Sequence, residues 1–300
     1  MFVPNLESTG ESTLRGLAYE LRPWQWYKQL ILYIAVIFSG SAGNLDAWIQ
    51  TTLGAILFSA VAGATYILND VQDREADRRH PRKRHRPIAS GQVTPSVAIL
   101  STAALYLGAG IVSWQLDRLF FGLIALYVVQ NFPYSAGLKK FMFVDLFSIS
   151  AGFVIRAVAG VVLVSAELSP WILLCTFLSA LMLGISKRWG ESQDVEDPAV
   201  IRTTLEDYSP RMLQFLLGSV ATTLLMAYAL YTFFARDLLM MLTIPFAFYA
   251  VFRFVHLTFV REGASEPAAL LLDRGLLVNF TLWGLTTVLL IYYQQLGVSL

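Results

Sequence analysis

Long apolar stretches, separated by short polar segments or by charged loops, make up most of the chain. Nine of them approach the roughly 20 mostly apolar residues that a membrane-spanning helix needs. The first follows an interfacial segment, residues 24–28, that is rich in aromatic side chains. The pattern predicts an all-α polytopic membrane protein with nine transmembrane helices, over residues 29–43, 47–68, 96–115, 118–133, 143–165, 169–186, 212–234, 237–255 and 276–296.

The composition agrees with this pattern and excludes several other classes of protein. Hydrophobic residues make up 56% of the chain and charged residues 14%, and the net charge is +1. A soluble domain carries about 25% charge, and a nucleic-acid-binding protein carries a clear excess of basic residues. The single cysteine, Cys175, cannot form an internal disulfide. We therefore expect one integral membrane domain over residues 1–300, with no nucleic-acid partner.

The 22 Lys and Arg residues are distributed very unequally between the two sides of the predicted membrane. Nineteen fall before the first span or around the loops that follow even-numbered spans, whereas Arg118 and Arg236 lie on the opposite side and Arg156 lies within a span. Cytoplasmic loops carry the excess of Lys and Arg, so we expect a cell-membrane protein with an external C-terminus. Three segments are predicted to be cytoplasmic: residues 1–22, 69–95 and 187–211.

The acidic motif 69-NDVQDREAD-77 follows the second predicted span directly. If the helix continues beyond the membrane, Asn69, Asp70, Asp73 and Asp77 share one face, because they are spaced by three or four residues. Stacked carboxylates repel one another, and a divalent cation relieves that repulsion. Mg²⁺ takes one or two protein carboxylates and completes its shell with water and phosphate. The alternative is a solvated acidic helix end with no bound metal.

Two basic clusters lie on the same side as this motif. Residues 78–87 include Lys83 and Arg86, and the loop after the sixth span begins with Lys187, Arg188 and Glu191. Arginine and lysine beside a metal site can hold the remaining oxygens of a diphosphate. The alternatives are an anchor for anionic lipid headgroups and an ordinary charged loop.

Arg156 lies near the middle of the fifth predicted span. A central arginine costs about 2.5–3.5 kcal/mol on insertion scales and is therefore seldom without a role. It is either a phosphate ligand in a cavity or one member of a structural ion pair. Arg274, beside Asp273 before the ninth span, has the same two interpretations.

These motifs resemble the UbiA superfamily of intramembrane transferases. The first motif, N-D-x-x-D-x-x-x-D followed by R-P-I-A-S-G at 86–91, carries the resemblance to the superfamily. Within it, the chain is most similar to the polyprenyl-phosphate phosphoribosyltransferase branch. That similarity lies in 22-RPWQWYK-28, 66-YILNDVQDREADRRHPRKRHRPIASG-91, 133-PYSAGLKK-140, 151-AGFVIRAVAG-160, 186-SKRWGE-191 and 205-LEDYSP-210.

The resemblance implies Mg²⁺-dependent transfer of 5-phosphoribosyl from phosphoribosyl diphosphate (PRPP) to a polyprenyl phosphate such as decaprenyl phosphate, releasing diphosphate. Asn69, Asp70, Asp73 and Asp77 would bind Mg²⁺, and the three aspartates and Glu191 would be catalytic. It leaves open whether the protein is an oligomer. The implied substrate ligands are Lys28, Lys83, Arg86, Tyr134, Lys139, Lys140, Arg156, Lys187, Arg188 and Arg274.

Two other functions remain open at this point. Aromatic prenyltransferases of the superfamily carry a second D-x-x-x-D motif, whereas this loop has Lys187, Arg188 and Glu191, followed by acids three residues apart. That departure weakens the case for a prenyl diphosphate donor but does not remove it. A secondary transporter would use Arg156 as a ligand near the membrane midplane. The concentration of charge on one side favours an enzyme that acts on a cytosolic substrate.

The basic asymmetry generates the first testable prediction, the orientation of the chain. A cysteine introduced by Ser90→Cys should resist an impermeant thiol reagent in intact cells, whereas Glu167→Cys in an outer connection should react. Strong labelling of position 90 from outside would overturn the predicted orientation.

Overall fold

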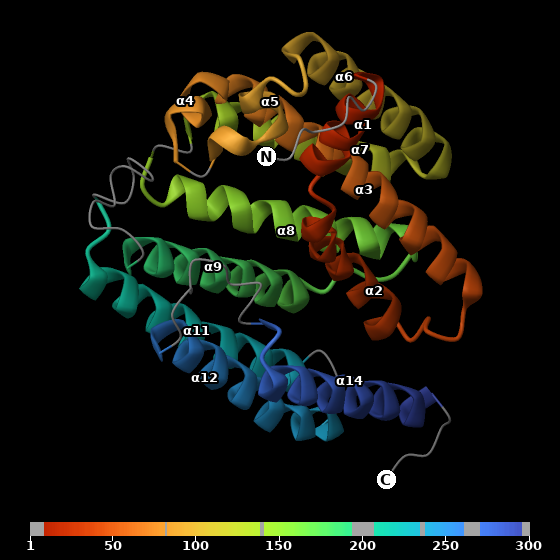
Figure 1. Ribbon diagram of the computed structural model, residues 1–300. Helices are drawn as coiled ribbons and strands as arrows, with labels where there is room; N and C mark the ends of the chain where they lie inside the picture. The colour runs from red at the N-terminus through yellow and green to blue at the C-terminus, as the bar shows by residue number, and fades with distance from the viewer. Residues whose placement is uncertain are drawn as a thin grey trace.

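The computed structural model describes residues 9–81, 83–138, 141–193, 207–234, 238–260 and 271–295, and every regular element within them is helical. The all-α prediction is therefore confirmed for the described part of the chain. The long helices are α3 (Leu45–Gln72), α6 (Pro95–Leu116), α7 (Arg118–Ala136), α8 (Val144–Leu163), α9 (Pro170–Gln193), α11 (Pro210–Phe234), α12 (Ile244–Val260) and α14 (Arg274–Gln295) (Figure 1).

Seven described segments are long and apolar enough to cross a membrane. They are α3, α6, α8, α9, α11, α14 and the run Leu238–Val260, in which the 3-10 helix η5 (Leu238–Thr243) leads into α12. The predicted count of nine is not confirmed. The segment predicted at 29–43 is divided between the 3-10 helix η1 (Pro23–Leu32) and the short α2 (Tyr33–Phe38). The segment predicted at 118–133 lies on α7, which contains Pro133.

Small polar side chains fix the starts of several long helices. Asn44 accepts a hydrogen bond from the Asp46 N–H at 2.9 Å before α3, and Asp117 accepts one from the Phe120 N–H at 2.8 Å before α7. These caps satisfy N–H groups that have no partner within the helix.

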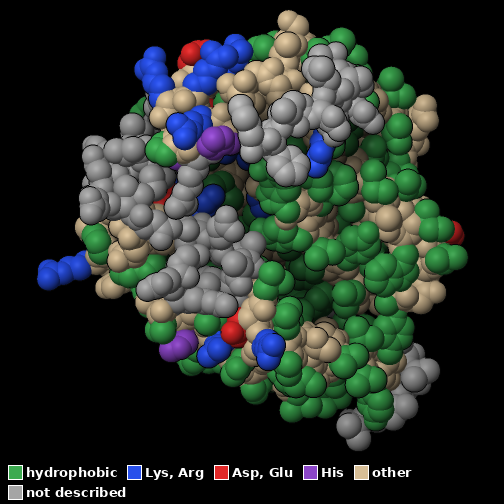
Figure 2. Space-filling model, viewed as in Figure 1, with side chains coloured by type: hydrophobic (Ala, Val, Ile, Leu, Met, Phe, Trp, Pro, Cys, Tyr) green, Lys and Arg blue, Asp and Glu red, His purple; other side chains and the backbone are tan. Residues whose placement is uncertain are grey.

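Four short elements gather at the C-terminal end of α3 (Figure 1). They are α1 (Thr9–Glu20), α4 (Arg74–Arg79), η2 (Lys83–His85) and α5 (Pro87–Ser90). Gly91 ends α5 with a φ of 87°, a conformation that glycine adopts without strain. These elements form a polar cap over one end of the bundle, and Lys and Arg side chains gather there in Figure 2.

Helix α8 connects the two halves of the apolar core. Its residues Ile155 and Ala159 pack with α3 and α7, whereas Leu146 packs with the later helices. Large apolar side chains also cover much of the outer surface, and Leu100 and Phe215 are more than 70% exposed. Figure 2 shows hydrophobic side chains across most of the face below the basic cap. Such a surface is that of a protein solvated by lipid.

Gly160 on α8 permits a very close approach to η1. A Cβ atom at this position would lie 2.3 Å from the Leu32 carbonyl oxygen, which belongs to the backbone and cannot rotate away. Helix α8 therefore presses directly against the segment that carries Lys28 and Gln29.

This contact predicts a specific loss of stability. Gly160→Ala should destabilise the purified protein by about 1–3 kcal/mol because the added methyl group overpacks a backbone contact. Gly218→Ala on α11 is the matched control, since nothing lies within 4 Å of its Cβ position and alanine favours helix. Thermal unfolding in detergent measures both variants. Equal melting temperatures for the two would contradict the predicted close packing.

Candidate active site

Two buried aspartates and two arginines form an ionic cluster where α3 ends. Asp70 and Asp77 are each 3% exposed. Arg22 Nη2 donates to both carboxylate oxygens of Asp70, at 2.8 and 2.7 Å. Arg86 Nη1 donates to Asp70 Oδ1 at 2.9 Å and to Asp77 Oδ2 at 2.8 Å. A single cationic nitrogen thus bridges the two carboxylates.

The acidic motif does not lie on one continuous helix, which corrects the expected single-face stack. Helix α3 ends at Gln72 and α4 begins at Arg74, with Asp73 between them at φ −87° and ψ 4°. This break brings Asp70 and Asp77 together on Arg86, while Asp73 is half-buried at the corner. Within the described residues, no three Asp, Glu, His or Cys side chains converge as a metal site.

Asn69 is held by a hydrogen bond from α7. The side-chain oxygen of Asn69 accepts a hydrogen bond from the Ser135 hydroxyl. Ser135 directly follows the predicted ligand Tyr134 in the sequence. Lys83 lies close enough to Asp77 to affect its ionisation. Burial raises the pKa of Asp77, and the charges of Arg86 and Lys83 oppose that shift. The predicted site residues Asn69 and Lys83 therefore lie beside the ionic cluster.

Glu20, at the end of α1, is a member of this cluster that sequence analysis missed. It is 1% exposed, and its carboxyl group accepts a hydrogen bond from the Ile88 N–H at 3.1 Å. Burial, together with its hydrogen bond to Asp70, raises the pKa of Glu20 to about 8.

Arg156 lies within a second polar pocket, between α8, α3, α7 and η1. Its Nε donates to Gln29 Oε1 at 2.7 Å, Nη1 to the Gly152 carbonyl at 2.8 Å and Nη2 to the Tyr127 hydroxyl at 3.0 Å. The guanidinium also lies 4.6 Å from the centre of the Tyr127 ring. Lys28, which belongs to the same pocket, donates to Gln25 Oε1 at 2.7 Å. Arg156 is therefore not in an ion pair with any described carboxylate, contrary to the structural alternative considered above.

A third cluster surrounds Arg188, which is 1% exposed near the end of α9. Its guanidinium forms an ion pair with Glu191, and its Nε lies 3.7 Å from Asp145 Oδ2. Lys187 Nζ lies 3.9 Å from Glu191 Oε1. The Tyr208 hydroxyl donates to Asp145 Oδ1 at 3.3 Å. Sequence analysis missed Asp145 and Tyr208, because only the fold brings them to Arg188.

Among the remaining predicted ligands, Arg274 is not brought to these clusters. Arg274 is exposed at the start of α14, and its neighbour Asp273 instead forms a two-pronged ion pair with Arg253 at 3.1 Å. Lys139 and Lys140 lie outside the described residues. The ends of α3, α8 and α9 that carry the Asp70 and Arg188 clusters lie at the same end of the bundle (Figure 1).

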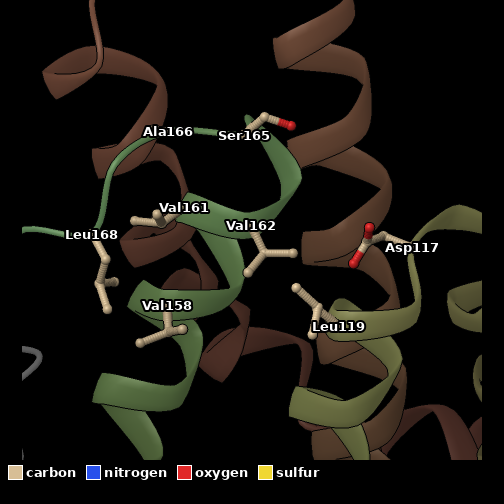
Figure 3. Close-up of a pocket in the computed structure, with 8 residues that line it drawn as sticks. All are labelled: Asp117, Leu119, Val158, Val161, Val162, Ser165, Ala166 and Leu168. Carbon is tan, nitrogen blue, oxygen red and sulfur yellow. The ribbon is translucent and has the colours of Figure 1, made fainter.

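Two cavities in the described structure are lined by residues other than those of the three clusters. One of about 290 Å³ lies between α2, α9, α11, α12 and α14 and is lined mainly by apolar side chains, among them Ile31, Ile34, Met182 and Trp283. The other, of about 380 Å³, lies at the opposite end of α7 and α8 from the clusters. Figure 3 shows valines of α8 lining it beside Asp117 and Ser165. It contains none of the predicted site residues.

Comparisons with known proteins agree on one family. The profile of the UbiA prenyltransferase family matches residues 30–285. Decaprenyl-phosphate phosphoribosyltransferase from Mycolicibacterium smegmatis is 32% identical, over 95% of both chains. The protein of the same name from Corynebacterium glutamicum is 31% identical over 94% of this chain and 88% of its own. A solved UbiA homolog from Archaeoglobus fulgidus, bound to GPP and Mg²⁺, has a TM-score of 0.70 at 18% identity, over 95% of this chain and 100% of that chain.

The Arg188 cluster gives a prediction about stability. Asp145→Asn should destabilise the protein by on the order of 3 kcal/mol, because it leaves a buried guanidinium with less compensating charge. Asp273→Asn breaks an ion pair nearer the surface and should change the melting temperature little. Thermal unfolding of the two variants in detergent makes the comparison. A smaller loss for Asp145→Asn than for Asp273→Asn would contradict the assigned ion pair.

Proposed function

The chain belongs to the UbiA prenyltransferase family, and we propose that it is a phosphoribosyltransferase that uses PRPP as donor and a polyprenyl phosphate as acceptor. The observation that carries the proposal is the buried pair Asp70 and Asp77, bridged by Arg22 and Arg86 at the polar end of the bundle. The family relatives that match nearly the whole chain, and are named for this reaction, support the choice of substrates.

The donor set of this cluster fits a divalent cation. Arg86 Nη1 contacts both carboxylates, so one cation can reach Asp70 and Asp77 together. Hard carboxylate and amide oxygens suit Mg²⁺, which needs only one or two carboxylates when a phosphate completes its shell. We assign Mg²⁺ to Asn69, Asp70, Asp73 and Asp77. When bound, it would stabilise the charge that develops on the leaving diphosphate.

The arginines of the cluster have a second role in this proposal. Arg22 and Arg86 compensate the carboxylates in the described structure, and both are partly exposed. If the carboxylates held Mg²⁺, the guanidinium groups of Arg22 and Arg86 would be free to donate to phosphate oxygens, which they bind as well as carboxylates. The same side chains thus hold the free site together and bind the donor.

The reaction makes modest demands on acid–base catalysis. An oxygen of the acceptor phosphate forms a bond to C1 of the ribose, while the bond from C1 to the diphosphate oxygen breaks. The attacking oxygen is already anionic, so the chain needs no strong general base. Glu191, held by Lys187 and Arg188, is proposed to orient a ribose hydroxyl.

The location of the site suits one soluble and one lipid substrate. PRPP is wholly polar, so we propose that it enters from the cytoplasm, where residues 69–95 and 187–211 are predicted to lie. The polyprenyl phosphate comes from the cell membrane that the long apolar helices would cross. An aromatic prenyltransferase and a transporter are also compatible with this arrangement, and transfer of label distinguishes both from a phosphoribosyltransferase.

Transfer of label tests the proposed reaction. Purified protein incubated with Mg²⁺, decaprenyl phosphate and PRPP labelled in the ribose should move the label into an organic-extractable lipid and release diphosphate without any gradient. An aqueous label, with a prenyl diphosphate instead alkylating 4-hydroxybenzoate, would establish the aromatic prenyltransferase. No chemical turnover with either donor would leave transport as the better explanation.

The metal assignment predicts a second result. Asp70→Asn should lower turnover at least about 100-fold, near 2.7 kcal/mol, because one charged ligand of the metal is lost. Chelation by EDTA should abolish wild-type activity, and added Mg²⁺ should restore it. Asp46→Asn, near the start of α3 at the opposite end of that helix, is the matched control. Undiminished activity in EDTA would refute the metal role.

A further inference from the structure

Helix η1 carries polar and apolar residues on a single face. A 3-10 helix has three residues per turn, so side chains three apart lie directly above one another. Lys28 and Ile31 are therefore stacked on η1, and Ile34 follows where α2 begins. Ile31 and Ile34 line the 290 Å³ apolar cavity. Within about two turns, this face thus changes from the cation of Lys28 to the apolar side chains of Ile31 and Ile34.

Lys28 and Arg156 form a pair of cations whose hydrogen-bond partners are neutral. Lys28 donates to the Gln25 amide oxygen at 2.7 Å and to the Tyr66 hydroxyl at 3.5 Å. Arg156 donates to amide, carbonyl and phenol oxygens, which use only part of the donor capacity of a guanidinium. The charges of Arg156 and Arg22 both act on Lys28. Two like charges in a buried pocket favour the binding of an anion.

The cations of the other two clusters have acidic partners. Arg22 and Arg86 contact Asp70, and Arg188 lies between Asp145 and Glu191. The Lys28–Arg156 pocket therefore differs from the other two clusters in its uncompensated charge. Because Arg156 is buried and Lys28 is half-buried, the anion that compensates their charge is best supplied by a ligand.

Tyr66 connects this pocket to the Asp70 cluster. The Arg22 guanidinium lies 4.7 Å from the centre of the Tyr66 ring, and Lys28 Nζ lies 5.8 Å from it. Tyr66 is also one helical turn before Asp70 on α3. An anion held by Lys28 would thus lie next to the proposed donor site, on the side that leads to the apolar cavity.

We propose that Lys28 and Arg156 bind the phosphate of the acceptor lipid, and that the apolar cavity beside Ile31 and Ile34 receives its first isoprene units. The inference rests on the proposed function, and it assigns this pocket to the acceptor rather than to the 5-phosphate of PRPP. An amphiphile with one phosphate and an apolar tail matches the order of cation and apolar wall along η1. PRPP is wholly polar and has no apolar group that could fill the cavity.

Steady-state kinetics with both substrates varied separates the two assignments. Lys28→Gln and Arg156→Lys should raise the KM for decaprenyl phosphate at least about 10-fold, because each loses a hydrogen bond to a charged group. Both should change the KM for PRPP less than about twofold. Arg118→Gln is the matched control, since Arg118 lies over the Trp114 ring at the other end of the bundle and should leave both constants unchanged. A raised KM for PRPP with an unchanged KM for the lipid would overturn the assignment.

A binding measurement keeps the inference independent of turnover and of folding. Farnesyl phosphate, without PRPP or Mg²⁺, should raise the melting temperature of the wild type, whereas farnesol should not. The shift should disappear in Lys28→Gln. Because the Lys28 side chain is only half-buried, this substitution disturbs folding less than Arg156→Lys and serves if that variant fails to fold. If the wild type makes no phosphoribosyl lipid but this phosphate-dependent shift depends on Lys28, the proposed function fails and the pocket remains. A shift that persists in Lys28→Gln, or that farnesol produces equally, would refute the pocket.

Discussion

The bridge from Arg86 to Asp70 and Asp77 is the contact on which the polar end of the molecule depends. A buried carboxylate costs several kcal/mol unless an opposite charge and hydrogen bonds compensate it. Here that compensation links the end of α3, the segment before α5 and, through Arg22, the start of η1. Glu20 links α1 to α5 by accepting a hydrogen bond from the Ile88 N–H. The same charges that assemble the cap are the ones that a metal-bound diphosphate would use.

Charge balance distinguishes three cationic groups that look alike in the sequence. The arginines beside Asp70 are compensated but partly exposed, so a metal and a diphosphate can replace their contacts. Arg188 is compensated and almost wholly buried, which suits a residue that supports Glu191. Arg156 is buried and Lys28 is half-buried, and both have neutral partners, which suits a pocket completed by an anion. Each group thus has a different chemical role in the proposed transfer.

The sequence predicted most features that depend on local composition. The length of the apolar stretches predicted the long helices and the all-α fold class. The spacing of the acidic residues around Asp70 predicted a carboxylate cluster. The sequence could not predict the break at Asp73, across which Arg86, from a later segment, contacts both Asp70 and Asp77. Nor could it find Asp145 or Tyr208, whose partners are distant along the chain. Residues 29–43 read as a continuous span because hydropathy does not distinguish a 3-10 helix from an α-helix.

The proposed function requires that Asp70 and Asp77 can exchange their arginine partners for Mg²⁺ and a diphosphate. Titration of PRPP into the purified protein, followed by calorimetry, measures this step without turnover. The account predicts binding that requires Mg²⁺ and is lost in Asp70→Asn, while binding of a polyprenyl phosphate to that variant is retained. PRPP binding of equal strength without Mg²⁺, or in Asp70→Asn, would contradict it.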